Sequence, residues 1–410
     1  MEPREELCLT SFEHLIALSL LLLNVAVLVL VIMYAAQILA ALRPEPNTRP
    51  AGPDASRRVA VLVPAHDEED GIGATLAALR RAMTEGDKLL VIADNCSDAT
   101  ASIARAAGAE VVERHDPLHR GKGFALDAGL RHLAQSPPDI VIVIDADCLP
   151  QPDALRLLAE TSWSSGRPVQ SLYLMQAPAG APLGTKISEF AFMLKNRVRQ
   201  RGLQRLGLPC YLTGSGMAFP WQAIKELDLA DKHLAEDMKM GLQLSLAGNP
   251  PQFCEQAVVL SVFPETTAGL KTQRGRWMKG HISLIATALR ALPTAVLRGD
   301  VTAALATVAT AIPPLTLFVL LLGLLLALSL VVSVFVEAGS AAVLLSLFNL
   351  TLALAVTFVA WLKFGQELLP PRSAARAVWL ILARLIAAPI YFIGLRSTSW
   401  MRTDRSRSGK

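Results

Sequence analysis

Two aspartates that follow a short apolar run are the residues best suited to chemistry. Asp145 and Asp147 come directly after Ile140–Ile144, a run of β-forming residues. Two carboxylates just past a buried strand can bind a hard divalent cation through oxygen, and Mg²⁺ or Mn²⁺ held in this way completes its shell with substrate phosphates. A solvated turn with a helix N-cap would use the same residue types, so this pair alone does not decide between the two explanations.

Other polar residues also follow apolar runs. Pro64, His66 and Glu68 lie at and after the end of the first run, and Asp94 ends the second. His66 could contact a ligand or lie at the surface. Lys122, in an Arg-Gly-Lys-Gly segment, could reach a phosphate or sugar or be a solvated side chain. The segment matches neither a Walker A sequence nor GxGxxG, so a dinucleotide enzyme is not indicated.

Three more clusters lie downstream: Gly214 and Ser215 in a TGSG segment, Glu236 and Asp237 at the start of a helical pattern, and Gln273, Arg276 and Trp277 in a QxxRW pattern. Each cluster has a purely structural explanation. Acidic residues are favoured near a helix N-terminus, and a basic segment with a Trp is typical of a membrane surface.

The elements that must position these residues alternate between strands and helices. The pattern predicts strands at 59–63, 88–92, 110–113 and 140–144 and helices at 71–83, 99–107 and 125–134. This alternation indicates an α/β fold with a doubly wound, mostly parallel sheet. In such sheets ligands bind at the carboxyl ends of the strands, where the acidic clusters lie.

Long apolar segments indicate an integral membrane protein. Leu15–Leu42, Val301–Val336 and Ala338–Leu362 contain no charged residue, and each exceeds the roughly 20 residues that a helix needs to cross a bilayer. Ala377–Leu395 is a fourth candidate span, but it carries Arg384 near its middle. An Arg at that depth is costly, so this segment either spans with Arg384 turned inward or lies in the interface.

Flanking charges predict the topology and the domain boundaries. We expect an extracytoplasmic N-terminus (1–14), one transmembrane helix (15–42), a linker (43–58) and a cytosolic domain with interfacial helices (59–285). Interfacial and transmembrane helices (286–395) and a basic tail (396–410) would follow. If 377–395 spans, the tail is outside, against the positive-inside rule.

Composition excludes several classes of protein. Hydrophobic residues make up 52% of the 410 residues, and charged residues make up 18%, below the roughly 25% of a soluble domain. Disordered, collagen-like and disulfide-rich secreted proteins are therefore excluded. A net charge of +4 does not indicate nucleic acid as a partner. The five cysteines show no zinc-binding spacing and fit buried, reduced thiols.

A basic segment, Ile187–Leu206, has apolar residues at helical spacing together with several cations. We expect it to be an interfacial amphipathic helix that contacts anionic lipid headgroups. The alternative is a solvated basic helix packed on the domain.

The order of the motifs resembles membrane-embedded family 2 glycosyltransferases, such as cellulose, hyaluronan, chitin-oligosaccharide and poly-N-acetylglucosamine synthases. The resemblance covers about residues 58–285 and implies a GT-A-like fold with one span before it and two or three after it. Two positions depart from the family pattern: His66-Asp67 stands where an aromatic residue is common, and Thr213 stands where many members have Cys. The second departure leaves the acceptor preference open.

The resemblance also implies roles for the site residues. Asp94 would contact the base or ribose, Asp145 and Asp147 would hold Mg²⁺ or Mn²⁺ with Asp147 in the more direct position, and Asp237 would be the general base with Glu236 next in line. Pro64, His66, Glu68, Lys122, Gln273 and Arg276 would bind the nucleotide sugar, and Trp277, Gly214 and Ser215 the acceptor.

The implied reaction is an inverting transfer from a nucleotide sugar, expected to be a UDP-sugar, to a growing polysaccharide at the cytosolic face of a bacterial inner membrane. Three or four spans are few for an export pore, so a second copy or a partner protein would have to complete it. Single-transfer glycosylation of a membrane lipid is the alternative within the family. A non-enzymatic nucleotide-sensing membrane protein is a remote alternative, in which Asp237 would have no use as a base.

Overall fold

The computed structural model describes residues 3–44, 57–230, 235–336, 339–373, 376–377 and 379–380. Nearly all of the expected fourth span, the whole basic tail and most of the expected linker therefore lie outside the described residues.

An eight-stranded sheet forms the centre of the domain that follows the first helix. Its strands are β1 (Val59–Ala65), β2 (Lys88–Asp94), β3 (Glu110–Arg114), β4 (Ile140–Val143), β5 (Leu149–Pro150), β6 (Val169–Gln176), β7 (Met217–Pro220) and β8 (Gln252–Val262). Their order is β3-β2-β1-β4-β7-β6-β8-β5. β1 pairs in parallel with β2 and β4, β2 with β3, and β6 with β8, whereas β7 and β5 pair antiparallel with their neighbours.

Both faces of the sheet are buried, which explains why its central strands are nearly continuous apolar runs. In β1, Val61 and Val63 point into one core layer, and Ala60 and Leu62 point into the other. The covering helices are α2 (Ile72–Ala82), α3 (Thr100–Ala106), α4 (Lys122–Leu133), α5 (Ala154–Ser165), α8 (Trp221–Ile224) and α9 (Glu236–Leu246). The expected α/β alternation and mostly parallel sheet are thus confirmed.

The remaining helices join the sheet domain to an apolar bundle. They are α1 (Pro3–Ala41), α6 (Leu183–Met193), the π-helical turn η1 (Leu194–Arg199), α7 (Gln200–Arg205), α10 (Thr267–Leu297), α11 (Val301–Ala311), α12 (Leu315–Phe335), α13 (Ser340–Ala360) and the π-helical turn η3 (Trp361–Gly365). In the described part of the chain, four helices are long and apolar enough to span a membrane: 13–41, 268–297, 315–335 and 340–365.

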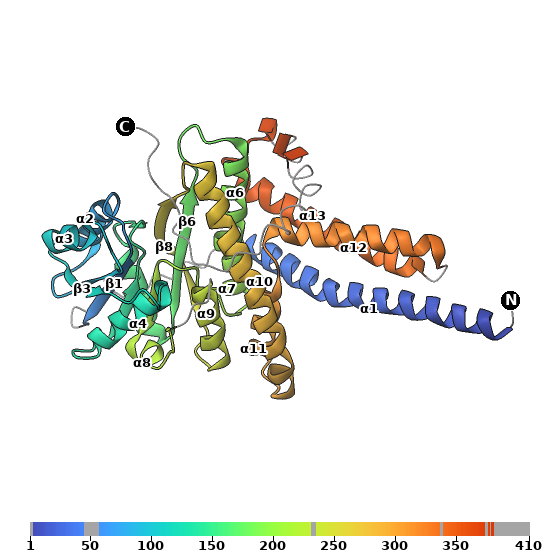
Figure 1. Ribbon diagram of the computed structural model, residues 1–410, viewed down its shortest axis with the longest axis horizontal. Coiled ribbons are helices and arrows are strands. Elements are labelled where there is room, and N and C mark those ends of the chain that lie inside the picture. The colour runs from blue at the N-terminus through green and yellow to red at the C-terminus, as the bar shows by residue number, and fades with distance from the viewer. Residues whose placement is uncertain are drawn as a thin grey trace.

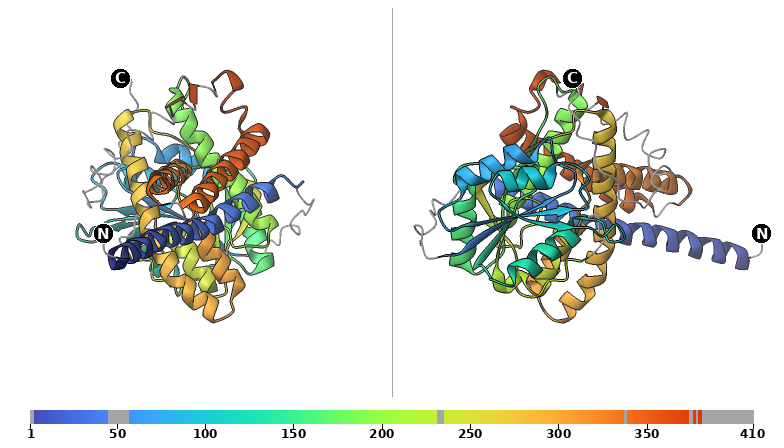
Figure 2. Two further views of the ribbon diagram at one scale, coloured as in Figure 1. Left: turned by 90° about the vertical axis from the view of Figure 1, so that its right-hand side faces the viewer. Right: turned by 60° about the vertical axis from the view of Figure 1, so that its left-hand side comes forward.

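The helices that follow the sheet domain and the first helix do not all run in one direction. α1, α12 and α13 run side by side away from the sheet, whereas α10 and α11 run across them along the side of the domain (Figure 1; Figure 2 shows the same crossing from two further directions). Residue 285, at which the sequence analysis ended the cytosolic domain, lies in the middle of α10, so one continuous helix crosses that expected boundary.

The apolar run Val301–Val336 is not one span, which corrects the sequence-based expectation. Ile312 is extended and is followed by Pro313 and Pro314, so α11 ends at Ala311 and α12 begins at Leu315. Proline disfavours a helical conformation of the residue before it, so the pair separates a short helix from one of spanning length.

The basic segment Ile187–Leu206 is also placed differently from the expectation of a lipid-facing helix. Arg199 is only 4% exposed and donates hydrogen bonds to Gln37 Oε1 of α1 (2.7 Å) and to the Tyr211 hydroxyl (2.8 Å). Arg197 and Arg201 pair with Glu255 of β8. Arg199 therefore links the segment to α1, and Arg197 and Arg201 link it to the sheet. All three have polar partners within the protein.

Candidate functional site

The carboxyl ends of β1 and β2 are held together by Asp94 and His66. His66 Nδ1 donates to the Asp94 carbonyl oxygen (2.6 Å), and Arg114 of β3 donates to Asp94 Oδ1 (2.6 Å). Asp94 is 5% exposed, and Arg114 holds its carboxylate at the end of the sheet; its contact with a base or ribose stays a prediction. Arg114 was missed in the sequence, although it is the cation that ends the third strand.

Two other residues expected to bind the nucleotide sugar, Pro64 and Glu68, lie at the end of β1 and on the loop after it. Pro64 lies within β1 opposite Ile92, and Glu68 is half-buried, with its backbone N–H donating to Thr100 Oγ1 (2.8 Å). Both therefore lie at the edge of the sheet where Asp94 lies. These bonds describe how the loop is held, and the roles of Pro64 and Glu68 in nucleotide binding stay predictions.

Lys122 and Asp145 meet where α4 begins and β4 ends. The Lys122 ammonium pairs with Asp145 Oδ1 and also donates to the Gly214 carbonyl oxygen (2.6 Å). Burial by itself lowers the pKa of Lys122, but the charges of Asp145, Glu236 and Asp237 outweigh it and raise this pKa. Lys122 therefore stays protonated and links three separate chain segments.

Asp147 lies beside Asp145 in a group that fits a hard cation. One possible ligand atom from each of Asp145, Asp147 and Cys148 lies within 4.8 Å of the others. Burial raises the pKa of the Cys148 thiol to about 12, so Cys148 stays a protonated thiol and the two carboxylates are the candidate ligands. Ser261 Oγ of β8 donates to Asp147 Oδ2 (3.4 Å) and orients it. Carboxylate oxygens suit Mg²⁺ or Mn²⁺.

Gly214 lies where the charged groups converge. Its φ of +94° favours glycine, and a Cβ there would lie 3.3 Å from Asp237 Oδ2, 3.6 Å from Lys122 Nζ and 3.8 Å from Asp145 Oδ2. The structure thus brings together residues that are separated by more than a hundred positions in the sequence.

Ser215 has a different place from the one expected for an acceptor contact. It is fully buried, and its Oγ accepts a hydrogen bond from the Asp145 backbone N–H (3.1 Å). Ser215 therefore supports the Asp145 loop and offers no exposed surface to an acceptor. Gln170 of β6, which sequence reasoning missed, fixes the same loop by donating to the Ser215 carbonyl oxygen (2.9 Å) and accepting from the Thr213 N–H (2.8 Å). A polar residue inside an apolar strand was the available signal for Gln170.

Glu236 and Asp237 are the first two residues of α9, and the pKa of each carboxyl group is raised. Burial, and then the charge of Asp237, raises the pKa of Glu236 to about 7. Burial also raises the pKa of Asp237, while the charges of Lys195 and Lys122 act against that rise. A carboxylate with a raised pKa next to a cation site is a good candidate for a general base.

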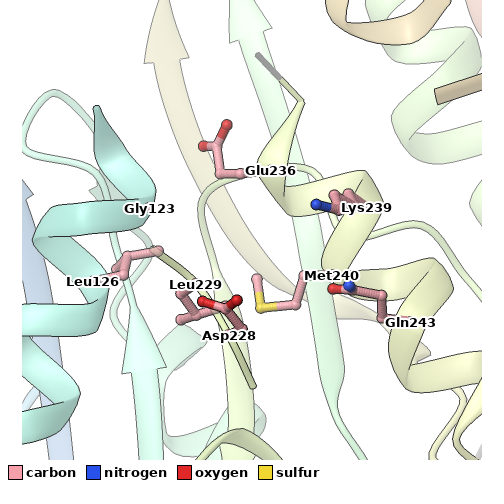
Figure 3. A pocket seen from close by; sticks show the side chains of 8 residues that line it. All are labelled: Gly123, Leu126, Asp228, Leu229, Glu236, Lys239, Met240 and Gln243. Atoms are coloured by element: carbon pink, nitrogen blue, oxygen red, sulfur yellow. The ribbon is translucent and has the colours of Figure 1, made fainter. Parts of the chain in front are cut away.

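A small pocket lies beside Glu236, between α4 and α9 (Figure 3). Gly123, Leu126, Asp228, Leu229, Glu236, Lys239, Met240 and Gln243 line it. The Lys239 ammonium end points toward this pocket from α9 (Figure 3). The pocket therefore adjoins the convergent site through Glu236.

The QxxRW residues lie on α10. Gln273 is 1% exposed, and Arg276 is half-buried. The Trp277 ring packs against Phe192 and Phe263, with ring centroids 5.5 and 6.5 Å apart. Phe263 follows β8 two residues after Ser261, which binds Asp147, so Trp277 lies near the same end of the sheet.

Comparisons with known proteins agree on one family. A family model described as "Glycosyltransferase like family 2" matches residues 56–280. The chain is 29% identical over 240 residues to the probable glycosyltransferase YdaM of Bacillus subtilis, covering 55% of each protein. It is 31% identical over 197 residues to an uncharacterized glycosyltransferase of Mycobacterium tuberculosis, covering 42% of this chain and 84% of that protein.

Two further proteins widen the comparison. The chain is 25% identical over 237 residues to poly-beta-1,6-N-acetyl-D-glucosamine synthase of Staphylococcus aureus, covering 54% of each. It thus spans about half the length of that synthase and of YdaM. The solved mannosyltransferase PcManGT of Pyrobaculum calidifontis, in complex with GDP-Man and Mn²⁺, superposes with a TM-score of 0.56 at 18% identity. This superposition covers 94% of this chain and all of that one.

Proposed function

The chain belongs to glycosyltransferase-like family 2, with a GT-A-like fold, and we propose that it transfers a sugar from a UDP-sugar to a growing polysaccharide. The proposed site of the reaction is the cytosolic face of a bacterial inner membrane. The observation that carries the proposal is the convergence of Asp237, Lys122 and Asp145 on Gly214.

Donor binding would use the carboxyl ends of the parallel strands. Asp94, fixed by Arg114, would contact the base or ribose, and His66 would stack beside it. Asp145 and Asp147 would hold Mg²⁺ or Mn²⁺, which would supply charge stabilisation for the diphosphate group of the leaving nucleotide. The solved mannosyltransferase PcManGT contains Mn²⁺ together with GDP-Man, which supports this expectation.

The transfer itself would use this chain's own acids and bases. The Asp237 carboxylate takes the proton of the acceptor hydroxyl as the oxygen bonds to the anomeric carbon, and the nucleoside diphosphate departs with the electron pair. Lys122 and Arg276 offset the charge that grows on the leaving group. One base without an enzyme nucleophile gives direct displacement, so we propose inversion at the anomeric carbon.

The acceptor would lie on the side of the site that adjoins α10. Trp277 offers an aromatic platform for a sugar ring beside Phe192 and Phe263, and Gly214 leaves space next to Asp237. Membrane lipids would surround α1, α12 and α13. A second copy or an export partner would complete a path for a polymer.

The test is to incubate purified protein with a panel of nucleotide sugars, measure nucleoside diphosphate release and analyse the products by mass spectrometry. We expect release from one UDP-sugar and products that carry several sugars. A lipid that carries a single sugar, with no higher species, would favour the lipid-glycosylation alternative instead. An absence of release with every donor would defeat the proposal.

Asp237→Asn separates binding from chemistry. The amide keeps the shape of the side chain but cannot take a proton, so donor affinity should persist while the transfer rate falls about 10²–10⁴-fold. Calorimetric donor binding and the release assay measure the two properties. A variant that retains more than a third of the wild-type rate would move the base to another residue, with Glu236 next.

A further inference from the structure

Lys195 brings a cation to the transfer site from the membrane side. It lies on the π-helical turn η1, and π-helical turns occur frequently at functional sites. Its ammonium donates to Met238 Sδ (3.3 Å), and Met238 directly follows Asp237 in α9. Met238 itself packs in the core layer that contains Tyr34 of α1 and Leu284 of α10. Lys195 therefore lies between the membrane helices and Asp237.

The ammonium of Lys195 has little direct compensation. A thioether sulfur is a weak acceptor, and among the described residues no carboxylate lies within the 4.0 Å of an ion pair with Lys195. Burying a cation without a close counter-charge is costly, and the burial accordingly lowers the pKa of Lys195. Arg199, one turn further along, adds a second positive charge. Among the described residues, the negative charge that acts against this lowering of the Lys195 pKa is that of Asp237.

The carboxyl group of Asp237 is the nearby group on which the charge of Lys195 acts. The charged groups of the described residues that act on Asp237 are Lys195 of η1, Lys122 of α4, Asp145 after β4 and the adjoining Glu236. Lys122 is already bonded to Asp145 and to the Gly214 carbonyl oxygen. Both cations act on Asp237, but Lys195, unlike Lys122, is paired with no carboxylate among the described residues, so its charge is not already matched by a close anion.

We propose that Lys195 is a positioning residue of the transfer reaction, whose ammonium holds the Asp237 carboxylate ionised and in place from the membrane side. The proposal rests on the proposed function, because it needs Asp237 to be the base. Lys195 acts through Asp237 and touches neither the donor nor the metal site. Its separation from Asp237 is longer than the 4.0 Å of an ion pair, so it acts through its charge and not through a direct contact.

The experiment is a double-mutant cycle on the full-length protein in lipid nanodiscs, with the UDP-sugar that is active in the panel. Lys195→Met should lower kcat about tenfold or more while donor affinity changes less than twofold, and Lys195→Arg should restore most of kcat. In the Asp237→Asn background, Lys195→Met should change the residual rate less than twofold, because the group through which it acts is gone. Lys186→Met on the exposed face of α6 is the matched control and should keep the wild-type rate.

Each other outcome has a clear meaning. A Lys195→Met variant that keeps more than half of kcat, loses donor affinity, or lowers the rate equally in both backgrounds overturns the proposal. If Lys195→Met does not fold, Lys195→Gln is subject to the same criteria. If the wild-type protein releases no nucleoside diphosphate from any donor, the proposed function fails. An active wild type with unaffected Lys195 variants defeats this inference alone.

Discussion

Single residues at this site serve more than one segment of the chain. The ammonium group of Lys122 pairs with Asp145 at the end of β4 and also donates to Gly214 in the TGSG loop, so it fixes both segments. Because an ammonium has three donors, it can do so and still face Asp237. The geometry of the site therefore depends on charge balance: removing any one of these groups leaves a buried charge without its partner.

The metal assignment predicts a defined loss. Asp147→Asn removes a carboxylate charge from the proposed cation site but keeps the size of the side chain, so metal-dependent UDP binding should weaken along with turnover. Chelation of the wild-type protein should abolish activity, and Mn²⁺ or Mg²⁺ should restore it. Calorimetry of UDP with and without Mn²⁺ measures the binding. Full activity in excess EDTA would contradict the assignment.

Glu236 predicts how stability depends on pH. Its folded-state pKa of about 7 lies above the ordinary glutamate pKa of 4.5, so its contribution to stability is present below about pH 4.5 and is lost as the pH rises through about 7. Glu236→Gln stays neutral, so it should raise the melting temperature at pH 8 and have little effect at pH 5, a difference of roughly 1–3 kcal/mol. Thermal melts without metal or nucleotide measure this.

The matched control is Glu226→Gln, whose side chain is 81% exposed and which should show no such pH-dependent difference. Equal effects of Glu236→Gln at the two pH values would show that folding does not raise the pKa of Glu236.

At the scale of elements, the sequence was informative where local pattern decides structure. The strands β1 to β4 and the acidic residues at their ends could be predicted, because both-face burial requires apolar runs and parallel strands collect their ends at one edge. The roles of Lys195, Arg199 and Ser215 could not. A charge pattern does not reveal which groups face it, and Gln37, Tyr211 and Asp145 come from distant parts of the chain.

The packing of α7 on α1 depends on Gly202. A Cβ at this position would lie 1.8 Å from the Gln37 carbonyl oxygen, which belongs to helix backbone and cannot move alone. Gly202→Ala should therefore push the two helices apart and lower the melting midpoint in detergent by several degrees, corresponding to about 1–3 kcal/mol or more.

Gly323→Ala in α12 is the control for this prediction, because a Cβ there meets nothing within 4 Å and alanine favours a helix. Similar melting midpoints for the two variants would show that the α1–α7 contact can relax without cost.

At the scale of the whole molecule, one apolar core joins the sheet domain to the bundle. It contains Ile38 of α1, Val198 of η1, Met238 of α9 and Phe318 of α12, so the proposed transfer site and the bundle share packed side chains. α10, which carries QxxRW, lies across the bundle direction (Figure 2). The length and composition of α10 would allow it to span, but its direction places it along the membrane surface if α1, α12 and α13 cross the bilayer.

This arrangement predicts a topology that cysteine labelling can check. With the N-terminus outside and α10 and α11 on the cytosolic surface, Asp300 between them lies inside, and Ser340 at the start of α13 lies outside. In a background with Cys8 and Cys96 replaced by Ser, an impermeant maleimide should label Asp300→Cys only in inverted vesicles. It should label Ser340→Cys only in intact spheroplasts. Cys148, Cys210 and Cys254 are buried, so they should not react with the reagent.

If α10 spanned instead, α11 would be too short to return and Asp300→Cys would be labelled from outside. Labelling of Asp300→Cys in spheroplasts would therefore refute the surface position of α10.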